Sequence, residues 1–351
     1  MDKSVDYIIV GLGLAGIAFA EELKKQSKTF VVFEDNSQTS SLVAGGMYNP
    51  VILKRFTAVW NAKEQLDLAI PFYRSLEKKL STSFDQPFDI YRTFKSIEEQ
   101  NNWFIASDKP ALQEYMHPEL VKVEAKHVIA PFQAGRLRHT GRIRVRELVS
   151  AYRAHLKKRG SLIEETFRHD SIITWDTHIE YKNWSCGKII FCEGNGLKSN
   201  PFFKNLPLNG TKGELLTIHA PDLKLDDVVK SAVFVLPLGD DLYKVGATFN
   251  WSDKTNKPTV EGKKELEDKL KTVITCGYKI VEHEAGVRPT TGDRRPLLGV
   301  HKDNNRLAVL NGLGTRGVMI APLMAKKLFQ YLENNQALDK EIDIRRFKQK
   351  N

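Results

Sequence analysis

The chain has 351 residues and a formal net charge of +10, and 41% of its residues are hydrophobic. This length predicts about two domains with a large core, while the apolar fraction excludes intrinsic disorder and the lack of a sustained repeat excludes collagen and coiled-coil architectures. The three cysteines, Cys186, Cys192 and Cys276, form no CxxC pair, so neither a disulfide framework nor a structural metal site is expected.

The first 34 residues predict a βαβ unit. Residues 6–10 form a short apolar run rich in β-branched side chains, which is typical of a buried strand. Glycines interrupt this run, and Ile17, Ala20 and Leu23 then recur at helical spacing before a second β-type run at 29–33. The order strand, glycine turn, helix, strand predicts two parallel strands joined by a right-handed crossover.

The early apolar segment does not indicate a membrane anchor. Residues 7–20 are too few to span a bilayer, and they include three glycines. The segment has no basic leader and no small-residue cleavage site, which argues against a signal peptide. We therefore expect a soluble, cytoplasmic protein without a transmembrane segment.

The glycine turn predicts a dinucleotide site. Gly11, Gly13 and Gly16 have the spacing in which the first glycine permits a tight turn, the second lets a pyrophosphate approach the backbone, and the third allows close helix–strand packing. The helix that follows offers free N–H groups and its positive dipole end to the phosphates. Glu34, at the end of the second strand, is placed to bind ribose hydroxyls and would repel a 2′-phosphate. The motif alone leaves FAD and NAD as alternatives.

The middle of the chain is less regular. Residues 62–80 predict a helix, whereas 81–140 contain prolines, aromatic residues and turn signals and predict no definite element. An amphipathic helix is expected from Val145 to Leu156. Short strands are predicted after it at 162–167, 171–175, 178–181 and 188–192.

Most of the positive charge lies in residues 136–159. This stretch has nine Lys or Arg residues and one acidic residue, Glu147. Such a cluster is typical of a surface that binds a polyanion such as nucleic acid, and it is equally typical of a solvated helix face. Both interpretations stay open on the sequence.

The second half predicts another, largely antiparallel sheet. Its expected elements are strands at 215–219, 232–236 and 242–249 and a helix at 261–274. A strand at 307–311 and a closing helix from about 322 to 332 follow, with Pro322 in the first helical turn. Between them, residues 312–317 repeat the GxGxxG spacing too near the end for another dinucleotide unit. This loop could present N–H groups to a cofactor or serve as a plain turn.

Several segments together resemble the family of D-amino-acid oxidase, glycine oxidase and sarcosine oxidase flavoproteins. The resemblance is carried by VGLGLAG with VVFE near the start, SSLVAGGM at 40–47, GVRPTTGDRRPLLG at 286–299 and LAVLNGLGTRGVMIAP at 307–322. KGELLTI, IIFCEG and YKVGATF also fall in the family's order. Within the family, the two C-terminal motifs look similar to the flavin domain of a bacterial enzyme that modifies the wobble uridine of tRNA.

The resemblance implies an α/β fold in which a Rossmann-type FAD-binding domain is interleaved with a smaller antiparallel-sheet substrate domain. The FAD-binding domain would comprise residues 1–80, 141–212 and 286–351, and the substrate domain 81–140 and 213–285. The residues implied to bind the cofactor are Gly11, Gly13, Ala15, Gly16, Glu34, Ser40, Ser41, Gly45, Gly46, Met47, Cys192, Glu193, Gly194, Arg288, Gly314, Thr315, Arg316, Gly317, Val318 and Met319.

The implied catalytic side chains are Arg288, Tyr48 and Arg316. Arg288 matches the arginine that holds the substrate carboxylate in amino-acid oxidases of the family, a task that suits a planar guanidinium; an ion pair between domains is the alternative. The family's carboxylate-binding tyrosine is replaced by Phe234. The residues to which some relatives attach flavin are absent from the two matching motifs, so non-covalent FAD is expected.

The implied reaction is oxidation of a C–N bond in an amino acid or N-substituted glycine, with hydride transfer to flavin N5 and hydrolysis of the imine in water. The electron acceptor would be oxygen or a quinone-like molecule. One alternative is removal of a carboxymethyl group from a modified uridine, with tRNA bound through residues 136–159. Another is a flavin-binding subunit without catalytic activity.

Overall fold

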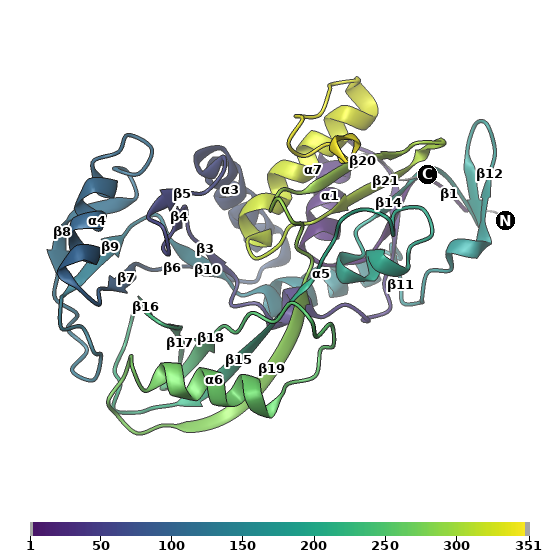
Figure 1. Cartoon of the computed structure of the whole chain (residues 1–351). Helices are drawn as coiled ribbons and strands as arrows, with labels where there is room; N and C mark the ends of the chain where they lie inside the picture. Colours follow the sequence, from purple (N-terminus) through teal and green to yellow (C-terminus); the bar gives the residue numbers. More distant parts are fainter. Residues whose placement is uncertain (1–2, 348–351) are drawn as a thin grey trace.

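The computed structural model describes residues 3–347 (Figure 1). Two eight-stranded sheets dominate it, together with a three-stranded and a two-stranded sheet. In the view of Figure 1, one large sheet and its helices occupy the upper right, and the other occupies the left and lower part. This arrangement, together with the structural matches reported below, confirms the predicted fold class.

The first large sheet begins with the predicted βαβ unit. β1 (Lys3–Val10) pairs in parallel with β2 (Phe30–Phe33), and α1 (Leu14–Lys25) connects them. The path β11-β2-β1-β14-β13-β12 continues the sheet, and β21 pairs with β14 and β20. Its remaining strands are β11 (Leu162–Ile163), β12 (Ile172–Thr174), β13 (Ile179–Tyr181), β14 (Trp184–Phe191), β20 (Leu297–His301) and β21 (Asn304–Asn311).

The helices of this half form the main core with the sheet. α1 packs against α7 (Gly317–Asn334), which also contacts α3 (Ala62–Leu80), and α5 (Val145–Lys158) lies beside α1. Short elements in this region are α2 (Ser40–Val43), β3 (Met47–Tyr48), β4 (Val51–Ile52), β5 (Thr57–Ala58), β6 (Asp85–Pro87) and β10 (Gly141–Ile143). The 3-10 helices are η1 (His169–Ser171), η2 (Gly194–Ser199) and η3 (Ile344–Arg346).

The second large sheet has the order β19-β15-β18-β17-β16-β7-β9-β8. All its neighbouring strands are antiparallel except β16 and β7, which are parallel. Its elements are β7 (Ile90–Thr93), α4 (Ile97–Ser107), β8 (Met116–Val121), β9 (Ala134–Leu137), β15 (Thr211–His219), β16 (Val228–Lys230), β17 (Phe234–Gly239), β18 (Leu242–Gly246), α6 (Val260–Leu270) and β19 (Lys279–Arg288). Because β15 and β19 run across the predicted boundaries at 212/213 and 285/286, the division into domains there stays a prediction.

Several predicted elements were wrong in extent. The strand expected at 162–167 ends at Ile163, the strand at 242–249 ends at Gly246, and the helix at 261–274 ends at Leu270. Residues 81–140, which predicted no definite element, contain α4 and four strands. Those strands are short and take part in pairings with distant segments, so their own residues carry little of the signal.

The closing helix also differs from the prediction. α7 begins at Gly317, so Pro322 lies inside the helix rather than in its first turn. A proline there cannot donate a hydrogen bond to the carbonyl four residues earlier, that of Val318. The buried Tyr73 hydroxyl donates to this carbonyl at 2.9 Å instead, which satisfies the freed acceptor and explains how the helix continues.

The structure also bears on membrane and metal binding. Within residues 3–347, none of the helices combines the length and apolar character needed to cross a membrane. In the same residues, no group of three or more His, Cys, Asp or Glu side chains is placed to hold a metal ion. Cys186, Cys192 and Cys276 are free thiols.

Candidate functional site

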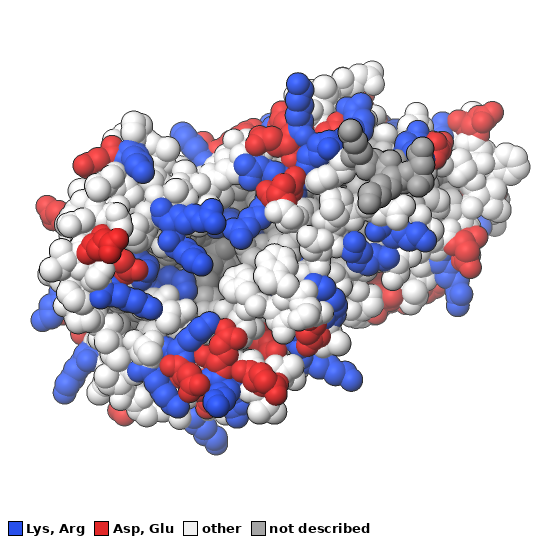
Figure 2. Space-filling model, viewed as in Figure 1, with Lys and Arg blue, Asp and Glu red and all other residues white. Residues whose placement is uncertain are grey.

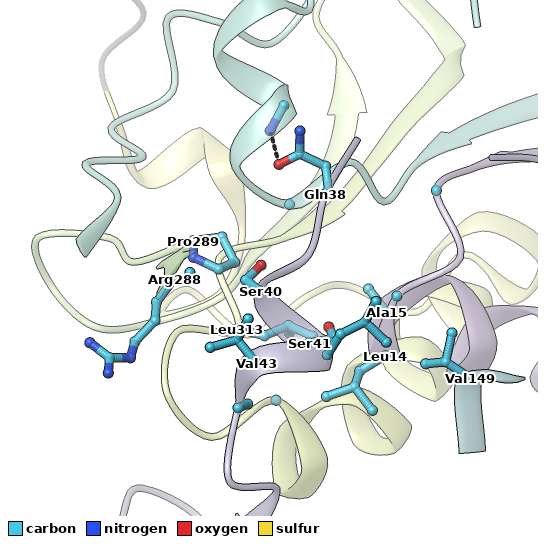
Figure 3. A pocket seen from close by; sticks show the side chains of 18 of the residues that line it. Leu14, Ala15, Gln38, Ser40, Ser41, Val43, Val149, Arg288, Pro289 and Leu313 are labelled. Atoms are coloured by element: carbon cyan, nitrogen blue, oxygen red, sulfur yellow. Dashed lines mark hydrogen bonds between the residues drawn. The ribbon is translucent and has the colours of Figure 1, made fainter. Parts of the chain in front are cut away.

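A cavity of about 650 Å³ lies where the two large sheets meet. Its wall includes the glycine turn before α1, the segment around α2, the end of β14, the loop before α7 and five strands of the second large sheet. Figure 3 shows Ser40, Ser41 and Val43 of α2 between Leu14 and Ala15 on one side and Arg288 on the other. A ligand that filled the cavity would therefore contact both halves of the molecule.

The glycine turn has no room for larger side chains. Gly11 has φ +99°, and a Cβ added there would lie 2.6 Å from the carbonyl oxygen of Cys192. A Cβ on Gly16 would overlap the carbonyl oxygen of Gly11, so this glycine allows the close packing expected of the third motif position. Gly13 is the N-cap of α1 and provides no side-chain cap, which leaves the first N–H groups of the helix available to a ligand.

Glu34 lies beside this turn. Its carboxylate accepts hydrogen bonds from the backbone N–H of Leu12 at 2.5 Å and of Asn36 at 2.6 Å, and the residue lines the cavity. These bonds fix the carboxylate at the end of β2 against the glycine turn. The position is the one from which an acidic residue accepts hydrogen bonds from a ribose.

The segment 40–47 forms a second side of the cavity. The Cα atom of Ser40 and the side chain of Val43 pack close to Gly286 of β19, where an added Cβ would lie 3.4 and 3.3 Å from them. Gly46 has φ +69°, and a Cβ there would overlap the carbonyl oxygen of Ile143. All five predicted residues of this segment, Ser40, Ser41, Gly45, Gly46 and Met47, line the cavity.

The residues after β14 are held in place by hydrogen bonds. Glu193 pairs with His169 at 2.8 Å and accepts from the Asn200 side chain at 2.7 Å. The Asn311 side chain donates to the carbonyl of Gly194 at 2.9 Å, which links this strand end to the second glycine loop. Burial raises the pKa of the Cys192 thiol well above its ordinary value, so this thiol stays protonated and inert.

The second glycine loop closes the cavity next to β19. Gly312 and Gly314 have φ +72° and +59°, and the N–H of Gly314 donates to the carbonyl of Pro289 at 3.0 Å. Residues 314, 315, 317 and 318 line the cavity. The loop is thus part of the cavity wall.

Arg288 is a cation in the wall formed by the second large sheet. Its guanidinium lies 4.6 Å from the centre of the Phe249 ring and donates to the Thr248 carbonyl at 3.3 Å. No carboxylate within residues 3–347 forms an ion pair with it, so the interdomain ion pair considered from the sequence is wrong. Burial lowers its pKa to about 10, which still leaves it charged at neutral pH. Arg288 is therefore a half-buried cation whose charge no carboxylate of residues 3–347 balances.

Four predicted residues do not line the cavity. Tyr48 lines a separate cavity of about 420 Å³, and its hydroxyl donates to Asp85 at 2.9 Å. Gly16 is enclosed by the glycine turn, and Met319 is buried with its sulfur accepting from the N–H of Asn49 at 3.3 Å. Arg316 is the N-cap of α7, and burial lowers its pKa. None of these side chains contacts the cavity, so direct catalytic roles for Tyr48 and Arg316 have no support in this geometry.

Sequence reasoning missed several residues of the cavity. Gly213 lies under the Arg288 guanidinium, because a Cβ at this position would overlap it. Lys230, Leu215, Phe249 and Lys269 also line the wall. The alignment of Gly213 opposite Gly286 depends on the pairing of β15 with β19, strands far apart in the sequence, and no local pattern reveals it.

Five of the nine cations in the basic stretch 136–159 form ion pairs within the chain. Its cations lie on β9, β10 and α5 and in the loops around them. Arg136 pairs with Asp89, Arg144 with Glu147, Arg146 with Glu284, and both Arg153 and Lys157 pair with Glu164. The stretch is therefore not one continuous free basic surface.

A family comparison decides among the interpretations of the cavity. The sequence model of the FAD dependent oxidoreductase family matches residues 6–331. The chain belongs to this family. The protein is thus an FAD-dependent oxidoreductase, as the sequence predicted.

Relatives of this FAD-dependent oxidoreductase differ in length. It is 24% identical over 345 residues to the tRNA 5-methylaminomethyl-2-thiouridine biosynthesis bifunctional protein MnmC of Marinobacter nauticus, covering 92% of this chain and 54% of that protein. It is 22% identical over 370 residues to the glycine oxidase of Bacillus subtilis, covering 96% and 95%. The chain thus spans about half the length of the first relative and nearly all of the second.

Solved structures share the fold. The glycine oxidase from Geobacillus kaustophilus matches with a TM-score of 0.78 at 19% identity, covering 96% of this chain and 97% of that one. The L-proline dehydrogenase from P. horikoshii matches with a TM-score of 0.77 at 14% identity, covering 96% and 95%.

The cavity fits the cofactor of the family. The turn at Gly11 and Gly16 admits no Cβ, the N-terminus of α1 is uncapped, and the Glu34 carboxylate lies beside both. These features suit a pyrophosphate and an adenosine ribose. The remaining wall, from α2 to the second glycine loop, leaves room for a flat ring system next to Arg288.

Proposed function

We propose that this flavoprotein oxidises the C–N bond of an amino acid or an N-substituted glycine. The observation that carries the proposal is Arg288, which lines the cavity at the end of β19 and has no carboxylate partner among residues 3–347. A guanidinium in this setting can bind a substrate carboxylate through two parallel charge-assisted hydrogen bonds. The glycine oxidase relative supports the same substrate class.

The chain's own residues would bind and orient the substrate. Arg288 would hold the carboxylate, and the half-buried Phe234 and the buried Leu215 would cover the apolar part and exclude water. When bound, FAD supplies the hydride acceptor at its N5 atom. In the proposed reaction a hydride would leave the carbon that bears the nitrogen, and water would hydrolyse the resulting imine. The predicted cofactor-binding residues that line the cavity are proposed to hold FAD without a covalent bond.

The proposal is tested with Arg288→Met and Arg288→Lys. Anaerobic mixing of the oxidised protein with a panel of amino acids and N-substituted glycines should bleach the flavin of the wild-type protein. In Arg288→Met the bleaching rate at low substrate should fall at least about a hundredfold, and Arg288→Lys should restore only part of it, because a lysine cannot form the paired bonds. FAD content measures whether both variants still bind cofactor. Undiminished bleaching in Arg288→Met would exclude the proposed carboxylate contact.

A second candidate is action on a modified uridine of tRNA. It is favoured by the similarity to MnmC over 92% of this chain. The ion pairs within 136–159 weaken the predicted contact surface, which leaves Lys158 and Arg159 as exposed cations at the end of α5. Salt-dependent tRNA binding that is lost in Lys158→Ala/Arg159→Ala would support this candidate. Absence of salt-sensitive binding would exclude it.

Two further choices are settled by the same preparation. If no amine bleaches the flavin, the result favours the alternative of a flavin-binding subunit without catalytic activity. If the substrate-reduced protein is reoxidised rapidly by air, oxygen is the acceptor, and rapid reoxidation only by a quinone indicates a dehydrogenase. A cytoplasmic location also stays a prediction, to be tested by cell fractionation.

A further inference from the structure

A second group of cations lies at the same cavity as Arg288. Lys230, the last residue of β16, lines the cavity together with Lys269 of α6. Arg92 of β7 and Lys95 just after it lie near enough to act electrostatically on Lys230. Figure 2 shows Lys and Arg side chains gathered around a hollow above α6, in the view of Figure 1.

The charges of this group are only partly balanced. Arg92 pairs with Glu99 at 3.0 Å, and Lys269 pairs with Glu265 at 2.5 Å. Lys230 has no carboxylate partner within residues 3–347, and its ammonium donates to the carbonyl of Ser231 at 3.1 Å. Burial, followed by the charges of Arg92, Lys269 and Lys95, lowers the pKa of Lys230 to about 8. The fold thus holds a cation in an unfavourable place without supplying the anion that would compensate it.

One face of the second large sheet lines the cavity and forms its floor. The register of the strands places Lys230 on this face. Lys230 is opposite Phe234, Phe234 is opposite Gly246, and Gly246 is opposite Leu215. All four residues line the cavity, and Arg288 lies over Gly213, two residues from Leu215 on β15. With strands about 4.8 Å apart, Lys230 begins about 14 Å from β15 across the floor. The two cations therefore face one floor from opposite sides.

This floor is suited to a bridging molecule. Gly246 makes room for the Phe234 ring, because a Cβ added at this position would lie 3.0 Å from the ring. The floor between Lys230 and Arg288 is therefore apolar, and no side chain rises from it at position 246. A methyl or hydrogen on the substrate nitrogen would leave the Lys230 side of the floor empty, whereas a longer substituent with a negative end would fill it.

We propose that the cavity takes an amine with two anionic ends: one carboxylate at Arg288 and a second anionic group, carboxylate or phosphate, at Lys230. This inference rests on the proposed function, because it assigns the part of the substrate that extends from the oxidised C–N bond. Lys95, Arg92 and Lys269 raise the positive potential at the Lys230 side and so favour the second anion over a neutral group. N-Methylglycine would then be a poor substrate compared with a glycine whose nitrogen carries an acidic chain.

The test compares Lys230→Met with Lys264→Met, a substitution on the exposed face of α6 that does not line the cavity. The substrates are N-methylglycine and N-alkylglycines that end in carboxylate or phosphonate after spacers of increasing length. Anaerobic flavin bleaching gives the dependence on concentration for each. Calorimetry with the corresponding ethers, in which oxygen replaces the amine nitrogen, measures binding without oxidation.

We expect at least one acidic chain to bind about tenfold or more tightly than its uncharged counterpart in the wild-type protein and in Lys264→Met. In Lys230→Met this advantage of the acidic chain over its uncharged counterpart should disappear. Whether the chains ending in carboxylate or those ending in phosphonate bind more tightly then shows which anion the Lys230 side prefers. The inference is overturned if no acidic chain gains affinity, or if the gain survives in Lys230→Met.

The two proposals fail in different ways. If N-methylglycine bleaches the flavin and no acidic chain improves on it, the second anion site is wrong and the proposed oxidation stands. If no amine bleaches the flavin, the proposed oxidation is wrong, and the ether ligands still decide whether Lys230 binds an anion.

Discussion

Substitution of Gly213 by alanine should displace the Arg288 guanidinium and disable substrate binding without unfolding the protein. A Cβ at position 213 would overlap both terminal nitrogens of Arg288, which are the flexible end of a side chain and can move. Gly213 does not have a positive φ, so alanine fits the strand backbone. The substitution should therefore move the Arg288 guanidinium and leave the free energy of unfolding nearly unchanged.

The expected size follows from the bonds that are lost. A hydrogen bond to a charged group contributes about 1.5–3 kcal/mol, and about 1.4 kcal/mol corresponds to a tenfold change. Gly213→Ala should therefore lower kcat/KM about ten- to a hundredfold, mainly through KM. Gly277→Ala is the matched control, because nothing lies within 4 Å of the added Cβ. Thermal unfolding and FAD content should be alike in both variants.

The assay is anaerobic flavin bleaching over a range of substrate concentrations. A double-mutant cycle separates displacement of Arg288 from simple crowding: in an Arg288→Met background, Gly213→Ala should have little further effect. An amine that lacks a carboxylate should react equally with the wild-type protein and with Gly213→Ala. The reasoning is refuted if kcat/KM for an amino acid is unchanged in Gly213→Ala, or if the two substitutions have fully additive effects.

Three further predictions concern other parts of the site. Tyr48→Phe should leave kcat/KM unchanged and lower the free energy of unfolding by about 0.5–1.5 kcal/mol, because it removes only the hydrogen bond to Asp85. Denaturant unfolding measures the stability, and a large loss of activity in a variant of normal stability would contradict this prediction. Gly16→Ala should destabilise the protein by about 1–3 kcal/mol and lower its FAD content, because the new Cβ would overlap the Gly11 carbonyl oxygen; calorimetric unfolding checks it, and an unchanged midpoint counts against it. At pH values above the Lys230 pKa of about 8, the ratio of the KM for an acidic-chain substrate to the KM for N-methylglycine should increase, because the ammonium loses its proton there; a ratio that stays flat with pH, as expected for Lys230→Met, would contradict the role of the charge.

The first part of the fold could be predicted because its signals are local. The apolar strands, the glycine spacing and Glu34 fall within 34 residues, and each follows from the preceding element along the chain. The periodicity of apolar residues likewise predicted the helix of Ala62–Leu80 and the amphipathic helix that begins at Val145. Resemblance to a family then placed the more distant segments, such as α2 and the second glycine loop, at the same cavity.

The second large sheet could not be predicted in the same way. β7 pairs with β16, more than a hundred residues later in the chain, and with β9, and none of these strands exceeds four residues. The role of Lys230 depends on this pairing, which the sequence around it does not indicate. In α7 the carbonyl left free by Pro322 is satisfied by Tyr73, a residue of another helix, so the sequence of α7 alone suggested too late a start.

The charge distribution required the coordinates as well. The nine cations of 136–159 suggested a polyanion surface, but four of them pair with acidic residues that lie outside the stretch: Arg136, Arg146, Arg153 and Lys157. Two cations of the cavity wall form no ion pair within residues 3–347: Arg288, which its sequence motif had pointed to, and Lys230, which no sequence pattern had marked. The sequence therefore located a basic stretch, whereas the ion pairs that balance part of its charge could be read only from the structure.

The central claim is that the protein holds FAD in this cavity and uses it to oxidise amino acids or N-substituted glycines. The most direct measurement is the visible absorbance spectrum of the purified, FAD-loaded protein before and after anaerobic addition of these amines. We expect a flavin spectrum that survives desalting, is released on denaturation, and bleaches with at least one amine that carries a carboxylate. A protein that takes up no FAD, or whose bound flavin is bleached by none of these amines, would contradict the claim.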